Sequence, residues 1–233
     1  MRVKAVVMCH NTPRTTEELR RRLSECFEVE VFDSGSDPDK RPECLAETFP
    51  NLYWTGCWKE AMRRHGDADW LWVLGGDLTL LDGPEKYLER LGFASNFNAA
   101  CWSPAVAGKC RDLMSAEKAA GNAYSVWHLE GQALALSRRM MDEIGRALPE
   151  ESPMGWGVDM WMCWRGWKAG MRNILDGKVR LSHPPDTGYD HKEALTQMRY
   201  LMEVYGGQRW GPEMRCHPWY ELFENNLREV WIG

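Results

Sequence analysis

The sequence predicts an α/β domain built on a mostly parallel sheet, and two stretches carry that prediction. Asp69-Trp70-Leu71-Trp72-Val73-Leu74-Gly75-Gly76-Asp77 is an apolar run of strand length that ends in two glycines and a carboxylate. Such a run is typical of a central strand that is buried on both faces of a parallel sheet. Residues 3–32 read as a strand, a helix and a strand, the beginning of a βαβ unit. Ligands bind such sheets at the carboxyl ends of the strands, where Asp77 would lie.

The bulk composition is that of an ordinary globular protein. The chain has 233 residues, of which 44% are hydrophobic and 27% are charged, enough for one α/β domain or two small ones. The net charge of −5 gives no global attraction to nucleic acid, although it does not exclude a local basic groove. No apolar run approaches the roughly 20 residues that cross a bilayer. The N-terminal apolar stretch is too short for a signal peptide and is expected to be a strand.

Cysteine and tryptophan usage also bears on function. The eight cysteines are scattered, and no two form a CxxC pair. Disulfide frameworks and zinc sites normally show tighter spacing, so we expect reduced thiols in a cytoplasmic protein. The 13 tryptophans are an excess. Packing explains most of them, and stacking on sugars or bases is the functional alternative.

The chain is expected to alternate strands and helices in one domain, because it shows no internal repeat and no linker. The elements expected in the first part are a strand (3–8), a helix capped by Thr15 or Thr16 with the arginines 20–22 toward solvent, a strand (28–32), a polar surface excursion (34–50), a helix (55–65), the strand that ends at Asp77, a turn and helix (78–91) and a strand (97–102).

The second part continues the alternation. Its expected elements are a loop over the site (103–121), a strand-like run (126–136), a helix (137–148), a helix with Asp159 at its start, two strands (173–176 and 179–183), an amphipathic helix (189–205) and a short aromatic helix in the tail (210–233). The sequence contains no G-x-G-x-x-G after the first strand and no G-x-x-x-x-G-K-[ST], so Rossmann cofactor binding and a P-loop are not supported.

Four polar residues follow strands or turns in an order that suggests a site. Asp33 and Asp77 each end an expected strand, and a carboxylate there can bind a base, a ribose or a cation. Asp159 follows a Gly-Trp-Gly turn; helix capping explains it structurally, and a catalytic carboxylate beside a tryptophan is the functional alternative. His183 ends the last expected strand, where a lone histidine before prolines is usually structural.

These features together resemble the GT-A fold of nucleotide-sugar glycosyltransferases, particularly the family 2-like enzymes. The resemblance covers roughly residues 3–192 and includes Cys9-His10-Asn11 after the first strand and Asp33-Ser34-Gly35-Ser36-Asp37 after the second. The family's DXD motif corresponds to Gly75-Gly76-Asp77, and its acceptor-side turn corresponds to Gly155-Trp156-Gly157-Val158-Asp159. His183 matches a histidine that completes the family's metal site. The sequence departs from DXD in keeping only the last carboxylate.

The resemblance implies a metal-assisted transfer of sugar from a nucleotide-diphosphate donor, expected to be a UDP-sugar, to an acceptor hydroxyl, as in hexosyltransferases. The metal, Mn²⁺ or Mg²⁺, would neutralise the leaving diphosphate. Asp159 would be the general base of an inverting reaction. The resemblance also implies which residues serve each role. The donor would be bound by Cys9, His10, Asn11, Asp33, Ser34, Gly35, Gly75 and Gly76, the metal by Asp77 and His183, and the acceptor side would be formed by Trp156, Gly157 and Glu130.

The single domain of residues 1–233 would then have a nucleotide-binding part of about 1–102 and an acceptor-side part of about 103–233. The acceptor stays open between a saccharide, a protein, a small metabolite and a hydroxymethylated base in phage-type DNA, which would need an extruded base and a positive groove. A non-catalytic sugar- or nucleotide-binding module is the alternative to an enzyme, and a nucleotidyltransferase is a weaker one. The sequence leaves the sugar, the base and the oligomeric state undetermined.

Overall fold

The computed structural model describes residues 1–44, 47–108, 119, 121–126, 128–184 and 190–206. Most of the predicted site loop and the predicted tail helix lie outside these residues. In chain order the elements are β1 (Val3–Cys9), α1 (Pro13–Leu23), β2 (Glu28–Ser34), η1 (Pro38–Lys40), β3 (Glu47–Phe49), α2 (Tyr53–His65), β4 (Trp70–Gly75), β5 (Thr79–Leu80), α3 (Pro84–Ser95), β6 (Ala99–Gly108), β7 (Ala123–Val126), β8 (Ala133–Ser137), α5 (Arg138–Glu143), α6 (Val158–Lys168), β9 (Arg172–His183) and α7 (His191–Gly206).

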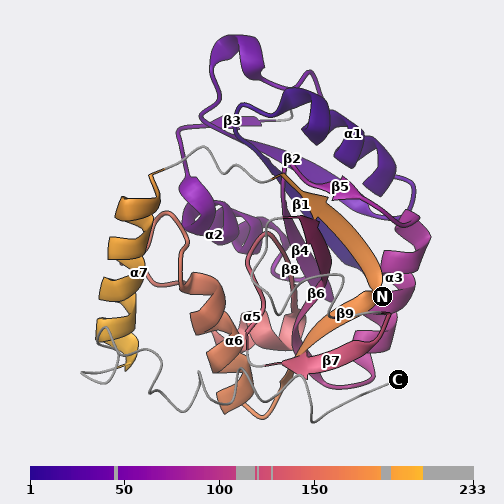
Figure 1. Cartoon of the computed structure of the whole chain (residues 1–233), viewed down its shortest axis with the longest axis vertical. Coiled ribbons are helices and arrows are strands. Elements are labelled where there is room, and N and C mark those ends of the chain that lie inside the picture. The colour runs from indigo at the N-terminus through magenta and orange to yellow at the C-terminus, as the bar shows by residue number, and fades with distance from the viewer. Residues whose placement is uncertain (45–46, 109–118, 120, 127, 185–189, 207–233) are drawn as a thin grey trace.

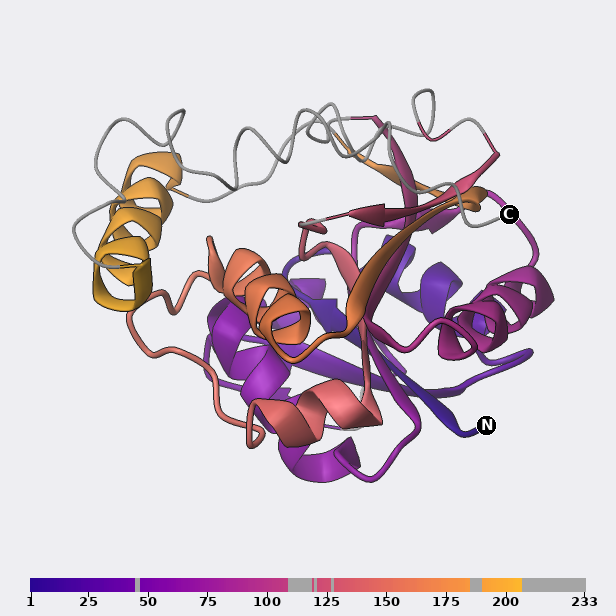
Figure 2. The same cartoon turned by 90° about the horizontal axis from the view of Figure 1, so that it is seen from below.

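The strands form one mixed sheet with helices on both faces, as the α/β prediction requires (Figure 1). Its order is β3-β2-β1-β4-β8-β6-β9-β5, and β7 pairs with β9. The strands β3, β2, β1 and β4 run parallel, whereas β8 runs antiparallel to both β4 and β6. Figure 2 shows α1 and α3 on one side of the sheet and α2, α5 and α6 on the other. None of the helices described is long and apolar enough to cross a membrane.

The position of β4, in the centre of the sheet with helices on both faces, explains why its sequence is apolar without interruption. Trp70, Trp72 and Leu74 point into the core under α1 and α3, while Leu71 and Val73 point into the core under α2, α5 and α6. Alternate residues of a strand face opposite sides, so a strand covered on both faces needs apolar residues throughout. The prediction of a buried central strand is therefore confirmed.

Several predicted elements were wrong in detail. The excursion at 34–50 contains β3, which pairs with β2. The two strands predicted at 173–176 and 179–183 are the single strand β9, and β6 continues to Gly108 through the start of the predicted loop. Helix α1 begins at Pro13, one residue after Thr12, so neither Thr15 nor Thr16 caps it. Arg22 is not a solvent-facing residue but donates hydrogen bonds to the carbonyl oxygens of Leu80 and Asp82.

The continuity of β9 depends on a bulge. Its pairing with β6 shifts register between Pro104 and Ala105, which pair with Asp176 and Arg180. The buried carboxylate of Asp176 stabilises the bulge: Oδ2 accepts from Arg90 Nε at 2.7 Å, and Oδ1 accepts from Lys178 N at 3.1 Å. Gly177 and Lys178 lie between the two predicted strands, and a tertiary contact from α3 holds the single strand together there.

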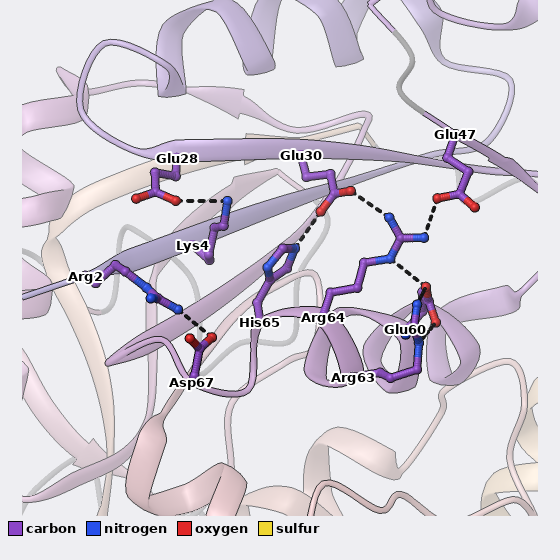
Figure 3. Close-up of polar contacts among 10 residues, drawn as sticks. All are labelled: Arg2, Lys4, Glu28, Glu30, Glu47, Glu60, Arg63, Arg64, His65 and Asp67. Carbon is purple, nitrogen blue, oxygen red and sulfur yellow. Dashed lines mark hydrogen bonds and ion pairs between the residues drawn. The ribbon is translucent and has the colours of Figure 1, made fainter.

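Arg64 of α2 connects the parallel edge of the sheet to the helix layer (Figure 3). Its guanidinium donates to Glu30 of β2, Glu47 of β3 and Glu60 of α2, and it lies over the rings of Phe32 and Phe49. Arg63 and Arg64 lower the pKa of Glu60 to about 2. The Arg64 side chain is only 20% exposed, so solvent screens these contacts less than it screens surface ion pairs.

We predict that Arg64→Ala lowers the free energy of unfolding by about 1–3 kcal/mol, because it leaves three carboxylates clustered without their shared cation. The neighbouring Arg63 is the matched control: its side chain is 68% exposed, and within the described part of the chain its ion pair is with Glu60 only. Arg63→Ala should cost at most about 1 kcal/mol. Urea unfolding of both variants measures the difference, and equal losses would contradict the bridging role of Arg64.

Candidate active site

The Gly75-Gly76-Asp77 turn at the end of β4 is held against the end of β1. Gly76 N donates to Met8 O at 2.7 Å, and Thr16 Oγ1 donates to Gly76 O at 3.2 Å. A β-carbon on Gly76 would lie 2.3 Å from Thr16 Oγ1 and 2.7 Å from Met8 O. Only glycine lets the two backbones approach this closely. The middle position of the motif is therefore set by packing.

Asp77 and His183 lie together although they are far apart in the sequence. His183 Nε2 is 3.4 Å from Asp77 Oδ2. The pairing that brings them together is that of β5, which follows Asp77, with the end of β9, where Thr79 is opposite Ser182. A short strand that the sequence did not reveal thus sets this distance.

The pair fits a divalent cation that shares its ligands with a substrate. One carboxylate oxygen and one imidazole nitrogen face each other, and His183 Nδ1 is buried without a hydrogen-bond partner among the residues that the structure describes. Among the residues described, no group of three or more His, Cys, Asp or Glu could hold a metal. Cations that keep several positions for water and phosphate oxygens need few protein ligands. Asp77, at 28% exposed, leaves such positions accessible.

The glycine in place of the first DXD carboxylate also has a structural consequence. A β-carbon on Gly75 would lie 2.8 Å from Asp77 Oδ1, and its next nearest neighbours are 3.9 Å away. The Asp77 carboxylate thus lies in the space beside Gly75 that a side chain at that position would enter. The backbone packing would therefore allow a side chain at position 75, whereas at position 76 it allows none.

The loops after β1 and β2 are joined into one surface. His10 Nδ1 is 2.8 Å from Ser34 O, Asn11 N donates to Ser36 Oγ at 2.8 Å, and Asp37 N donates to Asn11 Oδ1 at 2.9 Å. The Cys9 thiol is buried at 3.9 Å from Ser36 Oγ. The two segments predicted to bind the donor therefore lie side by side.

Asp33 lies beneath this surface. Its side chain is fully buried, Oδ1 accepts from Ser36 N at 3.2 Å, and Arg41 Nε lies 3.6 Å from Oδ2. Ser34 Oγ accepts from Leu52 N at 2.8 Å. Gly35 has a φ of +72°, and a β-carbon on it would lie 2.8 Å from Asn51 N. The turn after β2 is thus built by Asp33, Ser34 and Gly35.

Asp159 is tied to the same region from the other half of the chain. It lies in the first turn of α6, after Gly157, whose φ is +84°. Asp159 Oδ1 accepts from Met160 N at 2.8 Å, and Oδ2 accepts from Gly131 N at 3.0 Å. In the same turn Gln132 O accepts from Gly75 N at 3.0 Å. The turn at 130–132 therefore joins the end of β4 directly to the Asp159 carboxylate.

The predicted acceptor-side residues lie on both sides of Asp159. Glu130 is in the turn before β8, only 8% exposed, and accepts from Gln132 Nε2 at 3.3 Å. Trp156 contacts His191 of α7 edge to face, with ring centroids 5.5 Å apart. Gly157 is covered by α7, because a β-carbon there would lie 3.0 Å from Met198 Cγ.

Two residues at the site were missed. His128 Nε2 lies 3.3 Å from Asp159 Oδ2. Trp54 of α2 packs on the two glycine turns: β-carbons on Gly131 and Gly155 would lie 2.8 and 2.5 Å from its side-chain atoms. The sequence around His128 and Trp54 shows no motif that sets them apart from the other histidines and the other tryptophans of the chain, so only their tertiary neighbours identify them.

No family model matches the sequence, and no curated protein matches it. Among solved structures the fold is similar to that of GalNAc-T7 with UDP, GalNAc and Mn²⁺, with a TM-score of 0.66 at 14% identity over 89% of this chain and 48% of that one. It is also similar to S. aureus TarS in complex with UDP-GlcNAc, with a TM-score of 0.58 at 12% identity over 88% of this chain and 66% of that one. These neighbours are GT-A glycosyltransferases, so the predicted GT-A fold is confirmed. The chain spans about half to two thirds of the length of these neighbours.

We predict that Gly76→Ala lowers the free energy of unfolding by about 1–3 kcal/mol, because the new methyl group would overlap a backbone carbonyl and a buried hydroxyl. The matched control is Gly75→Ala, whose methyl group would lie 2.8 Å from the Asp77 carboxylate, a side chain that can rotate away, and 3.9 Å from the backbone atom Gln132 O. Thermal and urea unfolding of the two variants measure the contrast. A Gly76→Ala variant as stable as Gly75→Ala would show that the two backbones are not in close contact.

Proposed function

We propose that this protein transfers a sugar from a nucleotide-diphosphate donor to an acceptor hydroxyl, as a hexosyltransferase. The observation that carries the proposal is the turn at 130–132, which hydrogen-bonds both the Gly75-Gly76-Asp77 end of β4 and the Asp159 carboxylate. Sugar transfer needs a site for the diphosphate and a base for the acceptor next to each other. The presence of UDP-sugar components in two structures of the same fold supports UDP as the nucleotide.

The donor would lie across the joined loops after β1 and β2. Residues 9–11 and 33–35 would form the donor-binding part of these loops, with the buried side chains of Cys9 and Asp33 supporting it from beneath, and the fold's nucleotide-binding part would be about 1–102. Asp77 and His183 would hold Mn²⁺ or Mg²⁺ next to the diphosphate, and GalNAc-T7 was crystallised with Mn²⁺. When bound, the cation would stabilise the negative charge of the leaving diphosphate. Gly75 and Gly76 would let the phosphates approach the backbone.

Asp159 would take the proton of the acceptor hydroxyl as its oxygen attacks the anomeric carbon, and the reaction would then invert that centre. Trp156, Gly157 and Glu130 would form the acceptor side, within a part of the chain at about 103–233. The acceptor we propose is a saccharide or a hydroxymethylated base in DNA. The six described cysteines are free thiols, which supports a reducing compartment such as the cytoplasm.

Asp77→Asn and His183→Ala should each weaken Mn²⁺-dependent binding of UDP by at least about tenfold, since loss of even an outer-shell partner has such an effect. Isothermal titration of UDP with and without Mn²⁺ measures it. Asp69→Asn is the matched control, because Asp69 lies at the opposite end of β4, and its binding should equal that of the parent protein. A parent protein that binds no UDP with Mn²⁺ or Mg²⁺ would refute the proposed donor site.

Asp159→Asn should reduce sugar transfer by about 10²–10⁴-fold, the range of general-base catalysis, and leave UDP binding intact. Release of UDP from UDP-GlcNAc and UDP-GalNAc, with a saccharide mixture or hydroxymethylated duplex DNA as acceptor, measures transfer. Undiminished transfer would remove Asp159 as the base. UDP binding without transfer to any acceptor in the parent protein would instead favour a non-catalytic binding module.

A further inference from the structure

The indole of Trp54 fills the space that two glycines leave open beside Asp159. A β-carbon on Gly155, whose φ is +92°, would lie 2.5 Å from Trp54 Cβ and from Trp54 Cδ1. A β-carbon on Gly131 would lie 2.8 Å from Trp54 Nε1 and 3.6 Å from Asp159 Cβ. The nitrogen edge of the indole and the side chain of Asp159 therefore adjoin the same α-carbon. Trp54 Nε1 is thus next to the proposed general base.

The backbone on both sides of Trp54 is fixed to the two halves of the site. Leu52 N donates to Ser34 Oγ at 2.8 Å, at the end of β2. Thr55 N donates to Pro153 O at 3.2 Å, in the segment that precedes α6. The first turn of α2 therefore connects the donor side of the site to the acceptor side. These bonds hold the indole of Trp54 in one place between the two.

The indole N–H of Trp54 has no hydrogen-bond partner among the described residues. By contrast, Trp72 Nε1 donates to Ala133 O at 3.0 Å within the core. An indole N–H usually finds a partner when it is buried, but the Trp54 side chain is only partly buried at the edge of the core. Its N–H is therefore a donor that a ligand bound beside Asp159 can use.

We propose that Trp54 binds the acceptor and that the acceptor is a saccharide. The inference rests on the proposed function, in which Asp159 takes the proton of the attacking hydroxyl. An N–H donor next to that carboxylate suits a second oxygen beside the reacting one. Neighbouring hydroxyls of a pyranose are arranged in this way, whereas a hydroxymethylated base carries a single hydroxyl. The indole also offers an apolar ring on which a pyranose can pack.

Trp54→Phe keeps an aromatic ring on the two glycines and removes the N–H. The acceptor KM, measured by UDP release at saturating UDP-sugar and Mn²⁺, should rise about threefold to tenfold, the effect of losing one hydrogen bond. The donor KM should not change. A tryptophan that serves packing alone would leave the acceptor KM as it is, which overturns the proposal. A rise in the donor KM instead would assign Trp54 to the donor's sugar and would overturn it as well.

The matched control is Trp58→Phe. Trp58 lies one turn later in α2 and is fully buried in the core, and its Nε1 likewise has no hydrogen-bond partner among the described residues. The substitution removes the same atoms from the core rather than from the glycine turns, so the acceptor KM should equal that of the parent protein. Equal rises in the acceptor KM of both variants would trace the effect to the packing of α2 and refute the role of Trp54.

Saccharide binding can also be measured without activity. The indole N–H resonance of Trp54, assigned in the parent protein so that no variant is needed, is followed by ¹H–¹⁵N NMR in the presence of UDP and Mn²⁺. The probes are methyl glucoside, methyl galactoside and methyl N-acetylglucosaminide. A saturable shift of this resonance with at least one of them is expected. No shift with any of the three overturns the proposal.

The outcomes separate this inference from the function on which it rests. Transfer to a saccharide with a parental acceptor KM in Trp54→Phe refutes the inference alone. Transfer to hydroxymethylated duplex DNA but to no saccharide also refutes it and leaves sugar transfer standing. A saturable shift of the Trp54 resonance without UDP release supports saccharide binding at Trp54 and contradicts the proposed transfer.

Discussion

The hydrogen bonds of two adjacent glycine amides hold the candidate site together. Gly76 N donates to Met8 O of β1, and Gly75 N donates to Gln132 O in the turn before β8. The next amide in that turn, Gly131 N, donates to Asp159. Strand ends from the parallel half of the sheet and the helix start of the other half are thereby fixed relative to each other. Buried backbone groups need such partners, so the connection serves stability and the site alike.

This connection is supported by a rigid scaffold beneath it. Trp72, in the middle of β4, is fully buried against Phe27, Tyr87 and Trp102, and its Nε1 donates to Ala133 O at 3.0 Å. The tryptophan thus bonds β4 to β8 directly below the turn that carries the site. On the far side, Arg90 holds the bulge of β9, from which the strand continues to His183. Packing in the core thus accounts for several of the tryptophans for which stacking on sugars or bases was the functional alternative.

The sequence predicted those parts of the fold whose signals are local. The apolar run of β4, the βαβ beginning and the glycine turn before α6 each formed where the pattern indicated, because burial on both faces and positive φ angles restrict the residues allowed. The elements missed were short or bent. β3 and β5 have three and two residues, too few for a periodic pattern. The sequence predicts two strands in place of β9, because the contact that stabilises its bulge comes from Arg90 on α3, which is distant in the chain.

The sequence by itself determined the strand ends at which Asp33 and Asp77 lie, the helix start at Asp159 and the need for glycine in the turns. Only the tertiary structure decided which of these residues meet. The pairing of β5 with β9 brings His183 to Asp77, and the turn at 130–132 brings Asp159 to the end of β4 and His128 to Asp159. Chain order limits which strands can be neighbours, but the contacts between side chains depend on register and packing, which are properties of the whole sheet.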